Sequence, residues 1–368
     1  MLNYISLALS LFYAGTLFYL IIGAVRLYRK HSTSRKKPFI SIIVPLRNEG
    51  KGAQATLDAL AVQDYKGEWE VICVNDRSTD KTGAILKQMA KVDNHFKIIE
   101  IGQDEPHVTS PKKRALQRGF DNASGEIFIT TDGDCVPQPG WLTSMAKNFT
   151  APIGIVQGSK RIARADNLLT KFQEIETLAY VSVEAASFAL GKPMLASAPS
   201  LAYRRTLYEE AGGFDGMEHL VSGDDDMLVH KMQQSGNYEV RYNVDPEACV
   251  RTQPANTWKE MLLQRARWAS NGLHYESRWF VLFLICLFSY YVMVVAGPFL
   301  VITGLLRWEL FVFSLAVKFI LDHIFVFRIT KKLFGRRALL NLWWAEFLHY
   351  PIIVFSVITG HLGLYKWK

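Results

Sequence analysis

The chain has 368 residues, of which 49% are apolar and 21% charged, and its mean hydropathy is +0.07. This balance excludes a disordered chain and a chain that lies wholly within a membrane, and four scattered cysteines without a CxxC pair exclude a zinc ribbon or a disulfide scaffold. The net charge of +8 suits a nucleic-acid binder, a protein on anionic lipid or an enzyme for phosphorylated substrates, and charge alone does not choose among them.

The first predicted element is a membrane helix over residues 2–25, where no charged residue occurs. At about 1.5 Å per residue this stretch can cross a hydrocarbon core of about 30 Å. A cleaved signal peptide begins with basic residues, whereas here the basic residues follow the apolar stretch. The positive-inside rule places the N-terminus outside and Arg26 onward in the cytosol, and we assign residues 1–28 to an N-terminal transmembrane helix.

Residues 37–275 follow with the pattern of a cytosolic α/β domain. Continuous β-branched runs, typical of strands buried on both faces, occur at 39–44, 70–75, 97–101 and 126–130. Helical patterns separate them, at 53–62, 81–92 and 112–120. This alternation predicts an α/β fold with a mostly parallel sheet and helices on both faces, in which ligands bind beyond the carboxyl ends of the strands.

Two carboxylates follow the strand at 126–130. Asp132 and Asp134 are separated only by Gly133, which allows a tight turn in which both carboxylates face one point. Because two such carboxylates repel each other, a hard divalent cation is the simplest partner, and an oxygen-only site indicates Mg²⁺ or Mn²⁺ bridging to substrate phosphates. The alternative is a solvated acidic turn.

Polar residues follow the other strands as well. Asp76 ends the strand at 70–75 and can accept hydrogen bonds from a base or a ribose. Lys112, Lys113 and Arg114 open a helix directly after Pro111, so a basic cluster and a positive helix N-terminus offer a place for pyrophosphate. A set of surface salt bridges would explain each charge singly, but not their common edge. The sequence therefore predicts a nucleotide-diphosphate site there.

Three further acids, Asp224, Asp225 and Asp226, precede a helical run at 227–232. Acidic residues at a helix start are favoured by the helix dipole, so capping is one explanation. Three in a row exceed what capping needs, and one of them could serve as a general base whose pKa its neighbours set.

A third group of candidate residues lies on a predicted helix at 258–272. Gln264, Arg267 and Trp268 stand at i, i+3 and i+4 and share one face. Gln and Arg can donate to a phosphate, while Trp offers a flat wall for a sugar or a lipid. An amphipathic helix lying on the membrane surface explains the same pattern.

The apolar signal returns in residues 276–368, which we assign to a C-terminal membrane domain with three spans, at 280–306, 310–327 and 338–358. Gly297-Pro298 should kink or break the first of them. A basic loop between the last two belongs in the cytosol; it contains Arg328, Lys331, Lys332, Arg336 and Arg337.

Two of these spans carry polar side chains. Lys318 and Asp322 share a helix face and predict an intramembrane ion pair, while Glu346 and His349 give the fourth span a similar face. Interhelical polar contacts and a role in handling an acceptor headgroup both fit this pattern.

Taken together, these motifs resemble the family-2 glycosyltransferases, inverting enzymes with a GT-A fold that use a nucleotide-diphosphate sugar and a divalent metal. The resemblance covers residues 38–268. It rests on segments in the expected order: SIIVPLRNEG, VNDRSTD, SPKKRALQRGF, TTDGDCVPQPGWL, AGGFD, SGDDD and QRARW.

For the donor, the resemblance implies a set of nucleotide-binding residues. It places Asp76 against uracil or an equivalent base, and Lys112 in a K-x-x-ALN-like helix in which Gln117 replaces the commoner asparagine. It implies that Asp132 and Asp134 form a DxD pair that binds the nucleotide and Mg²⁺ or Mn²⁺. The residues that line the nucleotide pocket in this resemblance are Pro45, Arg47 and Glu49.

For the acceptor side, the resemblance implies that Asp225 is the catalytic base. Asp224 stands in place of a glutamate, and the additional Asp226 leaves the register open by one residue. Asp215 ends a GGFD element on the acceptor side. The Q-x-x-R-W motif, frequent in ceramide glucosyltransferases and polysaccharide synthases, is formed by Gln264, Arg267 and Trp268.

These implications lead to one favoured function and two alternatives. The favoured one is an inverting transferase that moves a sugar from a nucleotide-diphosphate donor, UDP-linked, to a lipid acceptor, with its catalytic domain on the cytosolic face of a bacterial cytoplasmic membrane. A processive polysaccharide synthase, which acts on a glycan, would need a channel for which four spans are few. A catalytically silent sugar-nucleotide-binding membrane scaffold is the other alternative. Membrane lipids are expected partners and nucleic acid is not, because no long basic run with interleaved aromatics occurs outside the juxtamembrane cluster.

Overall fold

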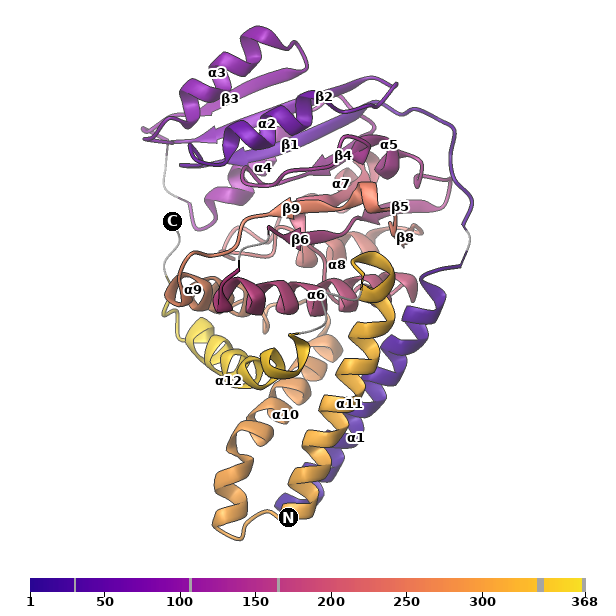
Figure 1. Cartoon of the computed structure of the whole chain (residues 1–368). Helices are drawn as coiled ribbons and strands as arrows, with labels where there is room; N and C mark the ends of the chain where they lie inside the picture. The colour runs from indigo at the N-terminus through magenta and orange to yellow at the C-terminus, as the bar shows by residue number, and fades with distance from the viewer. Residues whose placement is uncertain (30, 106–107, 164–165, 336–340, 366–368) are drawn as a thin grey trace. The chain divides into compact units, whose positions relative to one another are not determined.

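A computed structural model of the chain describes residues 1–29, 31–105, 108–163, 166–335 and 341–365. The chain divides into two compact units, whose elements Figure 1 labels. The sheet unit consists of Leu27–Ala163 and Ser187–Gln253. The helical unit consists of Met1–Arg26, Arg164–Ala186 and Pro254–Lys368.

The sheet unit contains a mixed, mostly parallel sheet of strand order β3-β2-β1-β4-β7-β5-β8. β1 is parallel to β2 and β4, and β7 is antiparallel to both of its neighbours. β6 and β9 form a separate parallel pair. The strands are β1 (Ile40–Leu46), β2 (Trp69–Asp76), β3 (Phe96–Ile101), β4 (Ile127–Thr130), β5 (Ile153–Gln157), β6 (Lys160–Ile162), β7 (Leu201–Arg204), β8 (Glu239–Tyr242) and β9 (Val250–Thr252).

Helices connect the parallel strands, and the alternation expected from the sequence is confirmed, with bounds within one or two residues for the first four strands. The helices of this unit are α2 (Ala53–Ala61), α3 (Thr82–Val92), α4 (Pro111–Asp121), α5 (Trp141–Ala146), α7 (Arg205–Glu210) and α8 (Asp226–Ser235). Two short 3₁₀ turns, η1 (Ala198–Ser200) and η2 (Pro246–Ala248), complete the unit.

Strand β1, which lies between β2 and β4, is buried on both faces, as its run of β-branched residues predicts. Val44 belongs to one apolar cluster together with Leu57 of α2 and Leu86 of α3. Ile43 points to the opposite face, where Gly119 of α4 packs so closely that a Cβ there would clash with the Ile43 side chain. Successive side chains of a strand alternate between its faces, so β1 packs against helices on both sides of the sheet.

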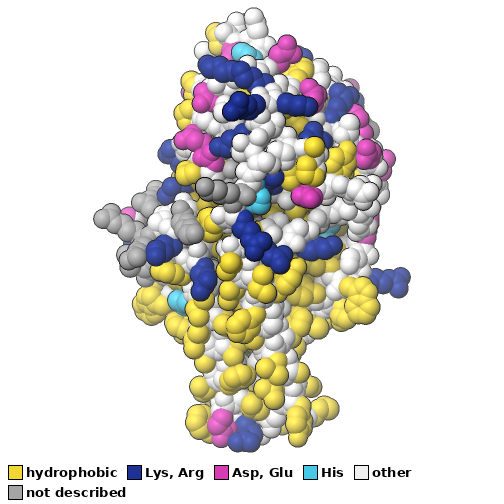
Figure 2. All heavy atoms as spheres, turned by 90° about the vertical axis from the view of Figure 1, so that its right-hand side faces the viewer, with side chains coloured by type: hydrophobic (Ala, Val, Ile, Leu, Met, Phe, Trp, Pro, Cys, Tyr) yellow, Lys and Arg dark blue, Asp and Glu magenta, His cyan; other side chains and the backbone are white. Residues whose placement is uncertain are grey.

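The helical unit contains α1 (Leu2–Arg26), most of α6 (Leu168–Ala189), α9 (Trp258–Ala269), α10 (Arg278–Ile302), α11 (Trp308–Leu333) and α12 (Leu342–His361). Within the described residues, four of these helices are long and apolar enough to cross a membrane, namely α1, α10, α11 and α12. Figure 2 shows apolar side chains covering the long helices over the face in view. The expectation of membrane-spanning helices is confirmed in length and composition.

The second span differs in detail from its prediction. α10 continues without a break through Gly297-Pro298 and ends at Ile302 rather than near residue 306. Gly304 follows at φ +72°, a left-handed conformation that commonly terminates a helix. The predicted start of the fourth span at Ala338, and Arg336 and Arg337 of the predicted cytosolic loop, lie outside the described residues.

The predicted ion pair between Lys318 and Asp322 is present, and it is part of a larger cluster. Lys318 of α11 is fully buried and contacts Asp322, and its Nζ lies 3.6 Å from Glu346 Oε1 of α12. The Tyr13 hydroxyl of α1 donates to Asp322 Oδ1 at 2.5 Å. The ammonium also lies 4.8 Å from the centre of the Tyr350 ring. One cation thus connects α1, α11 and α12.

The boundaries set from sequence at 28, 37 and 275 stay a prediction. In the structure, α6 and α9 are grouped with the long helices and not with the sheet. α9 packs extensively against α12.

We expect Lys318→Met to destabilise the protein by about 3–5 kcal/mol, because Asp322 and Glu346 would remain buried without their ammonium. Arg307→Met is the matched control, since its ion pair with Glu309 is exposed and such pairs contribute about 0–1 kcal/mol. Thermal unfolding in detergent measures both. Equal effects of the two substitutions would contradict a structural role for the cluster.

Candidate active site

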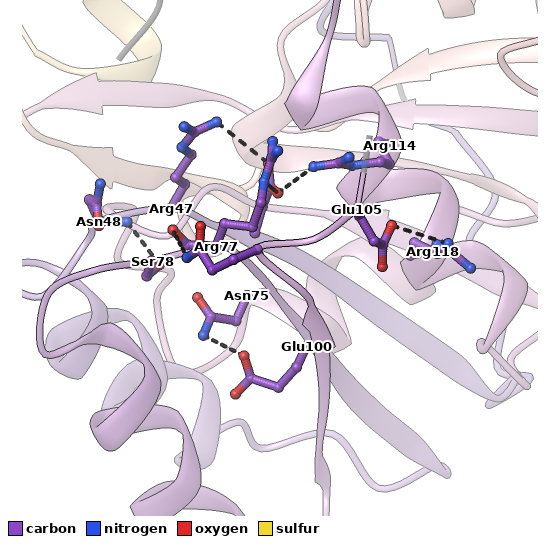
Figure 3. Close-up of polar contacts among 11 residues, drawn as sticks. Arg47, Asn48, Asn75, Arg77, Ser78, Glu100, Glu105, Arg114 and Arg118 are labelled. Atoms are coloured by element: carbon purple, nitrogen blue, oxygen red, sulfur yellow. Dashed lines mark hydrogen bonds and ion pairs between the residues drawn. The ribbon is translucent and has the colours of Figure 1, made fainter. Parts of the chain in front are cut away.

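The candidate site lies at the carboxyl edge of β1, β2 and β4, which are parallel and adjacent. The loops after β1 and β2 are joined to each other by hydrogen bonds. Asn48 N donates to Ser78 Oγ at 3.0 Å, Thr79 N donates to Asn48 Oδ1 at 2.8 Å, and Glu49 N donates to Thr82 Oγ1 at 2.9 Å. Figure 3 shows the first of these contacts. The loops hold each other in place, so the side chains at this edge are preorganised.

Asp76 at the end of β2 is buried and faces three arginines. Arg114 Nη2 of α4 donates to Asp76 Oδ1 at 2.7 Å, and Arg77 Nε donates to the same oxygen at 3.0 Å. Arg47 Nη1 lies 3.8 Å from Asp76 Oδ2. Figure 3 shows Arg47 and Arg114 approaching the end of β2 from different elements. The three guanidinium groups leave a net positive charge around one carboxylate.

The backbone is strained at this edge. Asn48 and Arg77 both adopt φ of +55°, in the left-handed region. Asn tolerates this conformation, whereas a residue such as Arg occupies it at a cost of about 1–2 kcal/mol. Such strain concentrates at functional sites, where the surrounding contacts enforce it.

Several buried polar atoms near Asp76 form no hydrogen bond with the described residues. The acceptors are Asn75 Oδ1 and Asp76 Oδ2, and the donors are Arg47 Nε and Arg77 Nη2. Because most buried polar groups have a partner, such a set at one strand end indicates hydrogen-bonding capacity for a ligand.

The DxD turn follows β4, with Asp132 and Asp134 both partly exposed. A Cβ on Gly133 would lie 3.1 Å from Leu46 Cδ2 and 3.2 Å from Glu49 Cγ. A larger residue at this position would therefore pack tightly against the side chains of β1 and its loop. This packing also explains how Glu49 comes to lie beside the DxD turn.

Lys112 connects the DxD turn to the acidic triplet. Its Nζ lies 2.8 Å from Asp132 Oδ1 and 2.8 Å from Asp224 Oδ2. Burial alone would lower the pKa of Lys112, but the carboxylates of Asp132, Asp224 and Asp225 raise it above its ordinary value. The ammonium therefore stays charged at physiological pH.

The neighbouring Lys113 has a different role, which the sequence did not reveal. It is buried, and its Nζ donates to the carbonyls of Met217 and Leu220 at 2.7 Å each. Desolvation lowers the pKa of Lys113 to about 8. Ser110, which caps α4, also donates to the Val221 carbonyl at 3.2 Å. These contacts fix the start of α4 against the segment that leads to Asp224.

Asp225 caps α8 and is partly exposed. Its Oδ1 accepts from Asp226 N at 2.9 Å, and its Oδ2 accepts from Ala198 N at 3.3 Å. Desolvation, reinforced by the charges of Asp224 and Asp226, raises the pKa of Asp225 well above its ordinary value. A carboxylate with a raised pKa is suited to accept a proton.

Two other predicted site residues lie apart from this charge cluster. Pro45 is a half-buried residue of β1, in register with Val74 of β2. Asp215 is exposed in the GGFD turn, where its backbone carbonyl accepts from Lys231 Nζ at 2.7 Å.

The Q-x-x-R-W residues belong to the helical unit, on α9. The unpredicted Arg265 is the buried member of this segment, and its Nε donates to Glu176 Oε2 of α6 at 2.9 Å. Its guanidinium lies 4.3 Å from the centre of the Trp268 ring and contacts Gln264 Oε1. Trp268 remains 41% exposed and Arg267 is partly exposed. The sequence signal for Arg265 was its place one turn from an aromatic residue.

The residues present fit a divalent cation that arrives with phosphates. Among the described residues, no group of three or more His, Cys, Asp or Glu side chains is placed to hold a metal ion by itself. Asp132 and Asp134 supply two oxygen-bearing side chains, and Mg²⁺ commonly uses one or two carboxylates together with substrate phosphates.

Comparison with known proteins gives a family match over nearly the whole chain. The family described as Glycosyl transferase family 21 matches residues 8–358. The chain is 28% identical over 240 residues to the Probable glycosyltransferase YdaM of Bacillus subtilis, covering 64% of this chain and 55% of that protein.

Two further relatives carry more specific names. The chain is 27% identical over 265 residues to a Poly-beta-1,6-N-acetyl-D-glucosamine synthase of Staphylococcus epidermidis, covering 70% of this chain and 61% of that protein. It is 27% identical over 238 residues to the Beta-monoglucosyldiacylglycerol synthase of Nostoc sp., covering 64% and 49%. The match thus spans about half the length of these relatives.

Among solved structures, the mannosyltransferase PcManGT from Pyrobaculum calidifontis, in complex with GDP-Man and Mn²⁺, is similar with a TM-score of 0.61 and 17% identity over all of both chains. At this identity the likeness concerns the fold. The predicted GT-A fold and the resemblance to glycosyltransferases are confirmed.

We expect Asp225→Asn to stabilise the protein at neutral pH. Because the pKa of Asp225 is raised, the folded state binds a proton that the unfolded state lacks between the ordinary and the raised pKa, so stability falls as pH rises through that window. Asn removes this loss. At pH 7 the unfolding temperature should rise by a few degrees, roughly 2–4 °C for each kcal/mol, and the gain should vanish toward pH 4.

Thermal unfolding in detergent between pH 4 and 8 measures this difference. Asp58→Asn in α2 is the control, since Asp58 is exposed and substitutions at such surface positions usually change the stability by less than about 0.5 kcal/mol. A loss of stability in Asp225→Asn that is constant over this pH range would contradict the raised pKa.

Proposed function

Because the chain belongs to glycosyl transferase family 21, we propose that it transfers a sugar, with inversion, from a nucleoside-diphosphate sugar to a lipid acceptor in the membrane. One observation carries this proposal. Lys112 joins Asp132 of the DxD turn to Asp224, next to the high-pKa Asp225, at the same sheet edge as Asp76. A donor-binding carboxylate, a diphosphate-binding cation and a proton acceptor are thereby brought together.

The polar atoms around Asp76 favour a donor base that carries a ring N–H beside a carbonyl. Asp76 Oδ2 would accept from the ring N–H, and Arg47 Nε or Arg77 Nη2 would donate to the carbonyl. Uracil satisfies this pattern, in agreement with a UDP-linked sugar, and guanine, whose ring N1–H lies beside its C6 carbonyl, satisfies it as well. Cytosine and adenine present an amino group beside an unprotonated ring nitrogen and fit it less well.

In the proposed reaction, Lys112 neutralises the charge that develops on the leaving diphosphate. Asp225 removes the proton from the acceptor hydroxyl. The acceptor oxygen forms a bond to the anomeric carbon while the bond from that carbon to the diphosphate oxygen breaks on the opposite face. Mg²⁺ or Mn²⁺ at Asp132 and Asp134 would add positive charge at the diphosphate.

A lipid acceptor fits the membrane-length helices. A transferase whose acceptor lies in a bilayer gains from being held there, and the exposed Trp268 with Gln264 and Arg267 offers an apolar wall beside polar donors. One relative is named as a glucosyldiacylglycerol synthase, which agrees with this choice. The basic residues after α1 favour a catalytic unit on the cytosolic side.

A processive polysaccharide synthase is the second candidate, favoured by the relative named as a poly-N-acetylglucosamine synthase. The part of the chain that the structure describes contains four helices of membrane-spanning length, which is few for a channel that would carry a polymer, so we place the synthase second.

Purified protein in detergent, with Mg²⁺ or Mn²⁺, tests the function in a screen of labelled nucleotide sugars with mixed lipid acceptors. We expect release of nucleoside diphosphate and one discrete glycolipid with a UDP-linked donor. A ladder of products would support the polysaccharide synthase instead. If no donor gave nucleoside diphosphate release, the chain would be a silent sugar-nucleotide-binding scaffold.

We expect Asp225→Asn to lower turnover by about 10²–10⁴-fold, because the acceptor hydroxyl would lose its proton acceptor. Binding of the donor should survive, since Asp76 and Lys112 are unchanged. Steady-state kinetics and equilibrium binding of UDP separate the two effects. Asp226→Asn is the matched neighbour, and it should keep most of its activity. If Asp226→Asn lost turnover and Asp225→Asn kept it, Asp226 would be the base. If both variants remained active, the base would be Asp224.

A further inference from the structure

Lys112 is a cation of the protein's own that is placed between two carboxylates. Its Nζ lies 2.8 Å from an oxygen of Asp132 and 2.8 Å from an oxygen of Asp224. The side chain of Asp224 is only 6% exposed and that of Lys112 20%, so this contact is largely shielded from water, whereas Asp132 keeps 29% of its side chain exposed. Charge pairs in such surroundings are screened much less than pairs on an open surface.

The structure also fixes where this ammonium can lie. Lys113, next in α4, donates to two backbone carbonyls of the segment that ends at Asp224, and Ser110 donates to a third. The start of α4 is therefore tied to the segment that carries Asp224. If the side chain of Lys112 moved, it would give up its contacts with both Asp132 and Asp224.

A divalent cation that approaches Asp132 alone meets two obstacles. One oxygen of Asp132 is already shared with Lys112, and the ammonium repels any second cation close to it. Moving Lys112 away would break its contacts with both carboxylates unless a further anion received the ammonium. A nucleoside diphosphate supplies that anion, because its phosphates can accept hydrogen bonds from Lys112 and ligate the metal at the same time.

We propose that Lys112 is the resident counter-ion of Asp132, so that the protein binds a divalent cation tightly only together with a nucleoside diphosphate, which takes over the Lys112 ammonium. This inference rests on the proposed function and adds that the metal does not bind tightly before the donor is bound. Metal and donor then bind with positive coupling, and by linkage each tightens the other by the same factor. Lys112 would thereby prevent the metal from occupying the site without a donor.

Titration of Mn²⁺, followed by the EPR signal of the free ion, tests this coupling without any turnover. The full chain in detergent is titrated with and without UDP, as wild type, as Lys112→Met and as Lys91→Met. Lys91 is an exposed residue of α3 and serves as the matched control. We expect UDP to tighten Mn²⁺ binding to wild type by at least about tenfold, and Lys91→Met to behave in the same way.

In Lys112→Met, we expect Mn²⁺ alone to bind at least about tenfold more tightly than to wild type, with most of the effect of UDP lost. Adding Asp132→Asn to this variant should remove the gain, which assigns the ion to the DxD turn. If Lys112→Met does not unfold cooperatively in a thermal scan, Lys112→Gln carries the same comparison.

Mn²⁺ affinity that is equal in wild type and Lys112→Met would overturn the proposal, and so would a gain that persists after Asp132→Asn. If UDP binds and sugar is transferred while the Mn²⁺ affinities are equal, the coupling alone fails. If wild type binds no nucleoside diphosphate at all, the proposed function fails and the coupling with it.

Discussion

Carboxylates from distant parts of the chain approach one another at the carboxyl edge of the sheet, and the ammonium of Lys112 lies between two of them, Asp132 and Asp224. Asp132 follows β4, whereas Asp224 and Asp225 precede α8. Without Lys112 these acids would be desolvated beside one another, an arrangement that raises carboxyl pKa values and destabilises the charged state. The contacts of α4 with the segment before Asp224 matter because they hold this cation in place.

A second buried lysine shows the same chemistry in a structural setting. Lys318 is fully buried, pairs with Asp322 and Glu346, and is enclosed by aromatic rings from α1, α10 and α12. Lys112 keeps part of its surface exposed and faces a partly exposed acid. A ligand can reach the cluster around Lys112, but it cannot reach the fully buried ammonium of Lys318. Accessibility, rather than composition, therefore separates a cluster that holds helices together from one that can exchange its cation.

Sequence reasoning succeeded where periodicity and topology decide the outcome. The β-branched runs gave β1 to β4, and the rule that parallel strands present their carboxyl ends together brought Asp76 and Asp132 to one edge. The spacing of residues along the helix could not assign Lys112 and Lys113 to different roles. Adjacent residues on a helix point in different directions, and only tertiary contacts decide which one is buried. The left-handed conformation of Arg77 was missed because no local pattern marks it, and the burial of Arg265 was missed because it depends on Glu176 of α6, a residue distant in sequence. The short, antiparallel β7 lacks the long apolar run that marked the other strands.

The two ends of the candidate site differ in charge, and this difference bears on what the site can bind. Around Asp76, three arginines face one carboxylate, so the β2 end carries an excess of positive charge. Around Lys112, the carboxylates of Asp132 and Asp224 each have an oxygen 2.8 Å from the ammonium, so that end is rich in carboxylates. A lone anion would be repelled by these carboxylates, and a lone divalent cation would be repelled by the ammonium of Lys112. A nucleoside diphosphate bound together with a divalent ion carries both charges, and it complements the whole edge in a way that neither component does alone.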